Sequence, residues 1–236
     1  MTEAQLTFKR YEKKYMIEPG RFDAFRKALD PYIKPDRFFS STVCSIYYDT
    51  DNYSLIRNSI EKPIYKEKLR LRSYNVPTED SPVFVELKGK FKGLVYKRRV
   101  MMKNQEAVEY LAGLRPSPVE GQVVREVDWF LHENPVSPKA FIGCDREAYV
   151  VRDNEELRIT FDENIRWRDR ELDLSLGSHG ENILPPGYVL MELKIPGAAP
   201  MWLARMLSEH CIFPAGFSKY GTCYKENLIN GVICNV

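Results

Sequence analysis

The sequence has no long apolar run, few histidines and an odd number of cysteines, and each of these features excludes a class of protein. No apolar stretch approaches the ~18 residues that span a bilayer, and the first fifteen residues lack the apolar region of a secretory signal. The five cysteines form no CxxC pair, which argues against a disulfide framework or a zinc knuckle. His132, His179 and His210 lie in no catalytic motif. We therefore expect a cytoplasmic protein with reduced thiols and a chemistry that does not depend on histidine.

The chain also lacks a net charge that would attract nucleic acid or a membrane surface. It has 35 Lys and Arg against 33 Asp and Glu, so any cationic feature must come from local segregation of charge. With 44% hydrophobic residues, the 236-residue chain can form a globular core. No repeat, low-complexity tract or linker divides it, and we expect a single domain over residues 1–236.

Strand-like segments dominate the chain, with short helices between them. Alternation and β-branched or aromatic content predict strands at 8–17, 42–50, 65–74, 83–90, 94–102, 140–151, 157–167 and 188–195. Apolar spacing predicts helices at 19–30, 104–113, 120–133 and 200–211, and a last one after Ser218. In the 120–133 helix we expect Val124, Val127, Trp129 and Leu131 to be buried. The predicted fold class is α+β, with about eight antiparallel strands.

The segment YKEKLRLRSY, residues 65–74, places a cation at every second position. A strand turns alternate side chains to opposite faces, so Lys66, Lys68, Arg70 and Arg72 share one face. Other predicted strands likewise carry cations on one face with fewer carboxylates: Arg10, Glu12 and Lys14; Glu86, Lys88 and Lys90; Lys97 and Arg99; Arg146; Arg158; Glu192 and Lys194. One interpretation is the solvated outer face of an antiparallel sheet.

A second interpretation is a barrel with this cationic face turned inward. Like charges on one strand face repel, and an enclosed set of cations is stable only with anions among them. The enclosed anion could be an extended polyanion such as a triphosphate or polyphosphate, because Arg donates two hydrogen bonds to one phosphate and Lys supplies a mobile point charge. Glu12 and Glu192 would then either pair with lysines or hold a hard divalent cation such as Mg²⁺ or Mn²⁺. The sequence leaves both roles open.

Eight short motifs occur in an order that resembles one family. They are R-Y-E-K-K-Y (10–15), S-I-Y-Y-D-T (45–50), K-L-R-L-R (68–72), F-V-E-L-K (84–88), Y-K-R-R (96–99), R-I-T-F-D (158–162), M-E-L-K (191–194) and F-S-K-Y (217–220). Over residues 8–228 the chain resembles the VTC-type polyphosphate polymerase domain of the triphosphate tunnel metalloenzyme (CYTH-like) superfamily, in a stand-alone, bacterial-like form.

The resemblance implies an eight-stranded antiparallel β-barrel tunnel with a cationic lumen, surrounded by short helices. It implies transfer of the γ-phosphate of ATP onto inorganic polyphosphate, with Mn²⁺ or Mg²⁺ as cofactor. The phosphate-binding catalytic cations it implies are Lys14, Arg70, Arg72, Lys88, Lys97, Arg146 and Lys219. Further substrate-binding residues are Arg10, Lys68, Arg99, Arg158, Lys194 and Ser218, and the metal ligands are Glu192 and Glu12. It leaves open a separate membrane protein as partner and a position at the inner face of the membrane.

Two positions bear on the choice of activity. Arg10 stands where other tunnel enzymes have the first Glu of an ExExK motif, which favours the polymerase branch, while Gly216 stands where polymerases have another lysine. Two alternatives remain: a tunnel-type triphosphatase in which Glu12 or Asp162 orients water, and a non-catalytic polyphosphate-binding module. Nucleic acid is not expected, because stacking aromatics are not interleaved with the cations.

Overall fold

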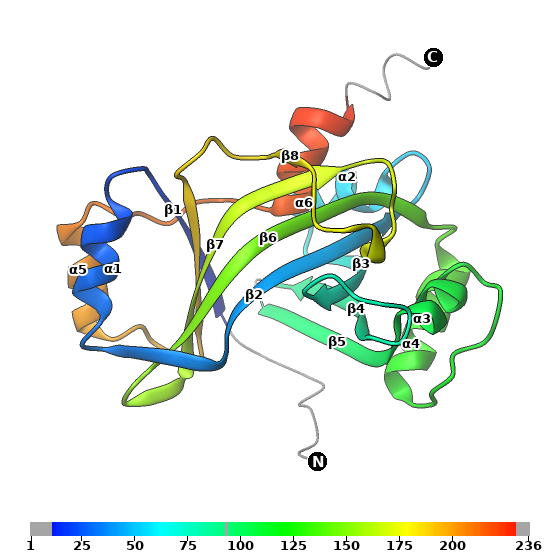
Figure 1. Cartoon of the computed structure of the whole chain (residues 1–236), viewed down its shortest axis with the longest axis horizontal. Coiled ribbons are helices and arrows are strands. Elements are labelled where there is room, and N and C mark those ends of the chain that lie inside the picture. Colours follow the sequence, from blue (N-terminus) through cyan, green and yellow to red (C-terminus); the bar gives the residue numbers. More distant parts are fainter. Residues whose placement is uncertain (1–10, 93, 230–236) are drawn as a thin grey trace.

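One long, curved antiparallel sheet organises the molecule (Figure 1). The structure is a computed structural model that describes residues 11–92 and 94–229. The hydrogen-bonded strand order is β1-β9-β7-β6-β2-β3-β4-β5, and the short β8 pairs with β7. The strands are β1 (Tyr11–Ile17), β2 (Ile33–Asp49), β3 (Tyr65–Tyr74), β4 (Pro82–Phe91), β5 (Leu94–Lys103), β6 (Ser137–Val151), β7 (Asn154–Arg168), β8 (Glu181–Asn182) and β9 (Val189–Ile195). The helices are α1 (Phe22–Leu29), α2 (Ser54–Ile60), α3 (Asn104–Leu111), α4 (Gln122–Glu133), α5 (Met201–Glu209) and α6 (Lys219–Cys223), with a 3-10 turn η1 (Leu174–Leu176) and a π-helical turn η2 (Tyr224–Leu228).

The predicted elements are present, with ends that shift by a few residues in most cases. The strand over 65–74 has the bounds that the sequence predicted. In contrast, β2 begins at Ile33 rather than at residue 42, and its pairing with β6 is irregular between Pro35 and Ser40. Helix α2 and strand β8 were not predicted. The start of the predicted 8–17 strand lies outside the described residues.

The expected burial of Trp129 on α4 is wrong. Val124 and Val127 are buried as expected, and Leu131 packs against the same core. Phe130 takes the remaining core position, and Trp129 is 67% exposed. The apolar stripe of α4 therefore follows the i, i+4, i+7 spacing of Val123, Val127 and Phe130, and Trp129 falls on the solvent side of that stripe.

Two apolar clusters cover the outer face of the sheet. One joins α1 and α5 to β1, β7 and β9, and the other joins α3 and α4 to β2, β3 and β4. Figure 1 shows these helix pairs on opposite sides of the molecule. A third cluster, built around Tyr47, Cys144 and Tyr220, packs α2 and α6 against the inner face of β2 and β6. The apolar residues of the strands are thereby buried, so the polar face of most strands must look into the curve of the sheet.

The α+β class and the antiparallel tunnel architecture are confirmed, although hydrogen bonds do not close the sheet. Strands β1 and β5 form its two edges, and no ladder joins them among the described residues. A side-chain contact bridges this side instead: Lys88 on β4 donates to Glu12 on β1, with Nζ and Oε2 2.9 Å apart. An ion pair between β4 and β1 thus bridges the side of the curved sheet where no backbone hydrogen bonds join its two edges.

No helix in the described part of the chain is both long and apolar enough to cross a membrane. In the described part of the chain, Cys44, Cys144, Cys211 and Cys223 are not joined in disulfides.

Candidate active site

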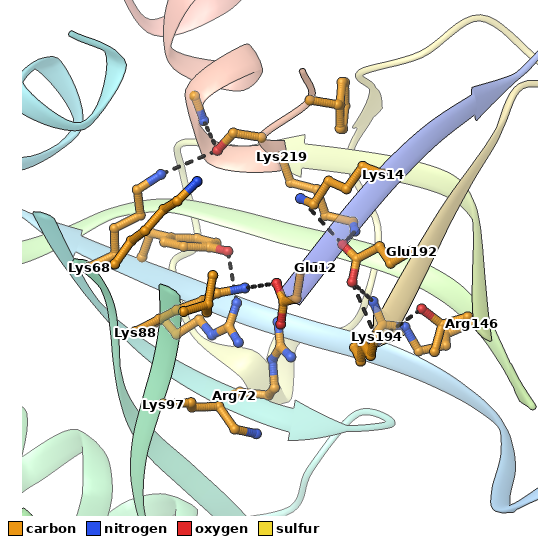
Figure 2. Close-up of a pocket in the computed structure, with 18 of the residues that line it drawn as sticks. Glu12, Lys14, Lys68, Arg72, Lys88, Lys97, Arg146, Glu192, Lys194 and Lys219 are labelled. Atoms are coloured by element: carbon orange, nitrogen blue, oxygen red, sulfur yellow. Dashed lines mark hydrogen bonds and ion pairs between the residues drawn. The ribbon is translucent and has the colours of Figure 1, made fainter. Parts of the chain in front are cut away.

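The curved sheet encloses a cavity of about 1510 Å³ with a strongly positive lining (Figure 2). Among the described residues that line it, seventeen are Lys or Arg and three are Asp or Glu. The whole chain has a formal charge of only +2, so the fold concentrates cations here. This arrangement supports the inward-facing interpretation of the alternating strands over a solvated outer face.

Every predicted site residue that the structure describes lines this cavity. They are Glu12, Lys14, Lys68, Arg70, Arg72, Lys88, Lys97, Arg99, Arg146, Arg158, Glu192, Lys194, Ser218 and Lys219. Arg10 lies outside the described residues. Lys13, next to Lys14 on β1, is exposed and does not line the cavity, as expected for the opposite face of a strand.

Three lysines lie directly opposite one another on neighbouring strands. Lys68 on β3 pairs in register with Lys88 on β4, and Lys88 pairs with Lys97 on β5. Like charges at directly opposed positions destabilise a sheet. Their partial compensation comes from Glu12 for Lys88 and from Glu86 for Lys97. These three lysines can still donate hydrogen bonds to a bound polyanion.

Glu86 is a buried counter-ion at the centre of one wall. Its carboxylate accepts from Arg70 (Nη2 to Oε2, 2.7 Å) and Lys97 (Nζ to Oε1, 3.3 Å), and it lies 3.9 Å from Arg72. Burial favours its neutral form, but these cations outweigh that effect and hold the pKa of Glu86 well below its usual range. Glu86 therefore orients Arg70 and lets the wall carry three cations in a low-dielectric setting.

A second ionic cluster occupies the opposite wall. Arg146 donates two hydrogen bonds to the Asp162 carboxylate, at 2.5 and 2.7 Å, and Lys219 forms an ion pair with the same carboxylate. Glu192 lies within 3.4 to 3.7 Å of four cations, Lys14, Lys219, Lys194 and Arg146. Burial opposes ionisation of Asp162, yet Arg146 and Lys219 lower its pKa to about 2.

Helix α6 carries Ser218 and Lys219 to the cavity. The Ser218 hydroxyl accepts from the Gly221 amide, which caps the helix, and from Lys68 Nζ at 3.2 Å. Tyr220 donates to Asp49, and its ring stacks on Tyr47 at 4.6 Å. The Asp49–Tyr220 hydrogen bond thus ties α6 to β2 and fixes the place from which Lys219 reaches Asp162.

Two residues of this site were not predicted from the sequence. Tyr47 lines the cavity and accepts from Arg70 at 3.1 Å; burial disfavours its phenolate, but Arg70, Arg72 and Lys68 lower its pKa to about 7. Glu86 was seen on the cationic face without a role. Alternation within 42–50 places Ser45 and Tyr47 on one face, and this was the signal available for Tyr47.

Several lysines of the cavity have depressed pKa values because burial penalises their charged form. Burial is the main cause for Lys97, whose pKa falls to about 7, and for Lys68 and Lys194, whose values fall to about 8. Between about pH 7 and 10 the folded chain therefore binds fewer protons than the unfolded chain. Without an anion, stability is expected to rise with pH across this window.

Affinity for a polyanion should change in the opposite direction. Raising the pH from 7 to 9 deprotonates these lysines, so we expect the affinity for tripolyphosphate to fall, with protons taken up on binding near pH 8. Calorimetry at pH 8 in buffers of different ionisation enthalpy measures that uptake. Equal binding enthalpies in all buffers would contradict the depressed pKa values.

A divalent cation fits the carboxylates only together with a phosphate ligand. Among the residues described, no group of three or more His, Cys, Asp or Glu side chains is placed to hold a metal ion. Glu192 and Glu12 line the same cavity. Burial raises the pKa of Glu12 and so does the charge of Glu192, but Lys88 and Lys194 outweigh both and lower this pKa to about 2. Mg²⁺ is often held by one or two carboxylates plus substrate phosphates, and this donor set meets that need.

Comparison with known proteins gives the family. The sequence model of the VTC domain matches residues 9–227. The chain belongs to the VTC domain family. The resemblance expected from the eight motifs is thereby confirmed. A comparison with curated proteins found no match.

Two solved structures share the fold of this VTC domain at low sequence identity. A candidate adenylate cyclase from Bacillus halodurans is 13% identical, with 91% of this chain and 96% of that chain covered and a TM-score of 0.57. A candidate adenylyl cyclase from Hippeastrum with a dominant triphosphatase activity is 16% identical, with 92% and 95% covered and a TM-score of 0.51. These likenesses concern the fold, and the chemistry must be argued from the cavity.

Proposed function

We propose that this VTC domain is a polyphosphate polymerase that transfers the γ-phosphate of ATP onto a polyphosphate chain inside the cavity. The observation that carries the proposal is the row from Lys66 to Arg72, which faces the cavity and spans about 20 Å at ~3.3 Å per residue. Such a row exceeds the length of a triphosphate and suits a chain of phosphates. We expect the reaction in the cytoplasm, with a separate membrane protein as a partner at the inner face of the membrane.

The side chains would act by alignment and charge neutralisation. Phosphoryl transfer depends on in-line placement and on stabilising the charge of the phosphoryl oxygens. Arg70 and Arg72 would hold the triphosphate from one wall, and Arg146 and Lys14 from the other. The acceptor is the terminal phosphate of the chain, which has a second pKa of ~6 and is mostly ionised at neutral pH. A dedicated general base is therefore not needed.

Glu192, with Glu12 beside it, would hold Mn²⁺ or Mg²⁺ together with the substrate phosphates. The ion would supply further neutralisation of phosphoryl oxygens. Lys14, Lys194 and Lys219 would keep the Glu192 carboxylate ionised and oriented, since each lies within 3.6 Å of it.

A triphosphatase is the second candidate, supported by the activity of the Hippeastrum relative. Hydrolysis would require a carboxylate that is free to orient water. Asp162 is fully buried against Arg146 and Lys219, and Glu12 accepts from Lys88. These contacts favour a polymerase over a hydrolase.

Phosphorus NMR of the purified protein with ATP and Mn²⁺ separates the possible activities. A growing signal from internal polymer phosphates with release of ADP supports the polymerase, and this signal should vanish in Arg72→Ala. Orthophosphate without polymer would instead identify a triphosphatase. An unchanged ATP spectrum combined with tight polyphosphate binding would identify a binding module.

Gly216 offers a gain-of-function test. It lines the cavity, and a Cβ added there would meet no heavy atom within 4 Å. Gly216→Lys should therefore fold normally and tighten polyphosphate binding about tenfold, since a charge-assisted hydrogen bond contributes about 1.5–3 kcal/mol. Gly216→Gln is the uncharged control, and polymer length at a fixed time is the second measurement. Equal affinity of both variants would show that this position does not face the chain.

A further inference from the structure

Tyr47 places a phenol among the cations that line the cavity. It lies on β2 directly opposite Arg70 on β3, and both side chains line the cavity. The Tyr47 hydroxyl oxygen accepts from Nη1 of Arg70 at 3.1 Å, while Glu86 holds Nε and Nη2 of the same guanidinium. The guanidinium of Arg70 is therefore held between a carboxylate on β4 and a phenol on β2.

The ring of Tyr47 is fixed in place by neighbours outside the cavity. It stacks on the Tyr220 ring, with centres 4.6 Å apart and planes at 16°. The Tyr220 hydroxyl donates to Asp49 at 3.0 Å, and Asp49 also accepts from the backbone amides of Leu55 and Ile56 at 3.0 Å. Strand β2 and helices α2 and α6 thus share in holding the ring, so its hydroxyl stays beside Arg70.

The hydrogen of the Tyr47 hydroxyl has no acceptor among the described residues. A phenol can accept and can also donate one hydrogen. The hydrogen bond that Tyr47 makes in the described part of the chain is the one it accepts from Arg70. The carboxylate of this wall, Glu86, is already engaged by Arg70 and Lys97. Because a buried donor without an acceptor is costly, this hydrogen is either lost to form a phenolate or donated to a ligand in the cavity.

Cations surround this hydroxyl and favour its ionised form before an anion binds. Burial disfavours the phenolate, but the charges of Arg70, Arg72 and Lys68 outweigh burial and lower the pKa of Tyr47 to about 7. The other charged or titratable groups near the ring are Glu86, which pairs with Arg70, Asp49, which accepts from Tyr220, and Cys144, Cys223, Tyr220 and Tyr224 of the same apolar cluster. Burial raises the pKa values of Cys144, Cys223 and Tyr220, so these three groups stay neutral at pH 8.

A bound polyanion would supply both an acceptor for the hydrogen and a negative charge that favours the neutral phenol. We propose that the Tyr47 hydroxyl is a further phosphate ligand of the cavity, which accepts from Arg70 and donates its own hydrogen to an oxygen of the bound polyanion. Where Tyr47 is ionised beforehand, the phenolate takes one proton from solvent as the anion binds. This inference deepens the proposed function and rests on it, because it takes a phosphate polyanion as the ligand of the cavity.

Calorimetric titration with tripolyphosphate at pH 6 and pH 8 tests the role of the hydroxyl. Tyr47→Phe keeps the stacked ring and removes the hydroxyl. At pH 6 the wild-type phenol is protonated, and Tyr47→Phe should bind about tenfold more weakly, because it lacks a hydrogen bond to a charged group. At pH 8 the wild type must first protonate Tyr47, which costs about tenfold per pH unit above 7, so the two affinities should become nearly equal.

Tyr48→Phe is the matched control. Tyr48 follows Tyr47 on β2, is buried in the outer apolar cluster and does not line the cavity. This substitution removes the same hydroxyl group from the opposite face of the strand. Tyr48→Phe should therefore bind tripolyphosphate like the wild type at both pH values.

Ultraviolet difference spectra follow the proton of Tyr47 directly and require no variant. At pH 8 a phenol with a pKa of about 7 is about nine-tenths ionised. Adding tripolyphosphate to the wild type should therefore remove tyrosinate absorbance that corresponds to about one residue. Tyr48→Phe should retain this change, and Tyr47→Phe should lack it.

Two results would overturn the inference. One is a ratio of wild-type to Tyr47→Phe affinity that stays constant from pH 6 to pH 8, because a purely structural role of the hydroxyl predicts no dependence on pH. The other is a wild-type tyrosinate absorbance that tripolyphosphate leaves unchanged. Either result, with tripolyphosphate bound by the wild type, leaves the polymerase proposal intact. Failure of the wild type to bind tripolyphosphate would instead contradict the proposed function itself.

Discussion

Replacing Glu86 by glutamine is expected to destabilise the fold by about 3–5 kcal/mol, because it leaves buried cations without their counter-charge. Glu86 is fully buried and contacts Arg70, Arg72 and Lys97. Glutamine keeps the shape and one acceptor oxygen, so the loss reports the charge rather than a cavity. Urea unfolding at pH 7 measures the change in the free energy of unfolding.

The matched control is Glu156→Gln, which removes the same charge from an exposed position near the start of β7, next to Leu157. It should change stability by less than about 0.5 kcal/mol. Tripolyphosphate should stabilise Glu86→Gln more than the wild type, since the added anion replaces the missing charge. A loss below about 1 kcal/mol, or no greater rescue by tripolyphosphate, would contradict the account of this wall.

Replacing Glu192 by glutamine should have opposite effects on catalysis and on metal-free binding. Glu192 lies close to four cations and is our candidate metal ligand. In the presence of Mn²⁺ we expect kcat to fall on the order of 10²–10³-fold, the usual cost of removing one electrostatic stabiliser of a transition state. When a chelator removes the metal, Glu192→Gln should bind tripolyphosphate about tenfold more tightly than the wild type, because the substitution removes a negative charge from the cavity.

This pair of measurements distinguishes a metal ligand from a purely structural counter-ion. A structural role for Glu192 alone predicts that activity falls only as far as stability or substrate affinity falls. Full Mn²⁺-dependent activity in Glu192→Gln would show that Glu192 is not a metal ligand. Weaker binding of tripolyphosphate in chelator would show that Glu192 positions the cations instead of opposing the anion.

The sequence predicted the cationic face because strand alternation is a local property. Lys66, Lys68, Arg70 and Arg72 obey it over the whole of β3, so face and bounds were both correct. The N-terminal part of β2 was missed because Pro35 and the neighbouring charged residues do not alternate, and the structure has an irregular pairing there. Helix α2 is only seven residues long, which gives a weak periodic signal.

Relations between strands could not be predicted from local pattern. The register that brings Glu86 opposite Arg70 and Arg99 depends on pairing across three strands. Likewise, the Asp49–Tyr220 hydrogen bond joins residues that are far apart in the sequence. Burial of a carboxylate and the register between strands are consequences of such non-local contacts, so the roles of Glu86 and Asp162 as counter-ions emerge only from the structure.

The most direct test of the central claim compares two adjacent lysines on opposite faces of β1. Lys14 lines the cavity beside Glu192, and Lys13 is exposed on the other face. Lys14→Ala and Lys13→Ala remove the same charge, so any global electrostatic effect is matched. Calorimetric titration with tripolyphosphate should show at least about tenfold weaker binding for Lys14→Ala and unchanged binding for Lys13→Ala. Equal affinities of the two variants would show that the inward cationic face is not where this protein binds phosphate.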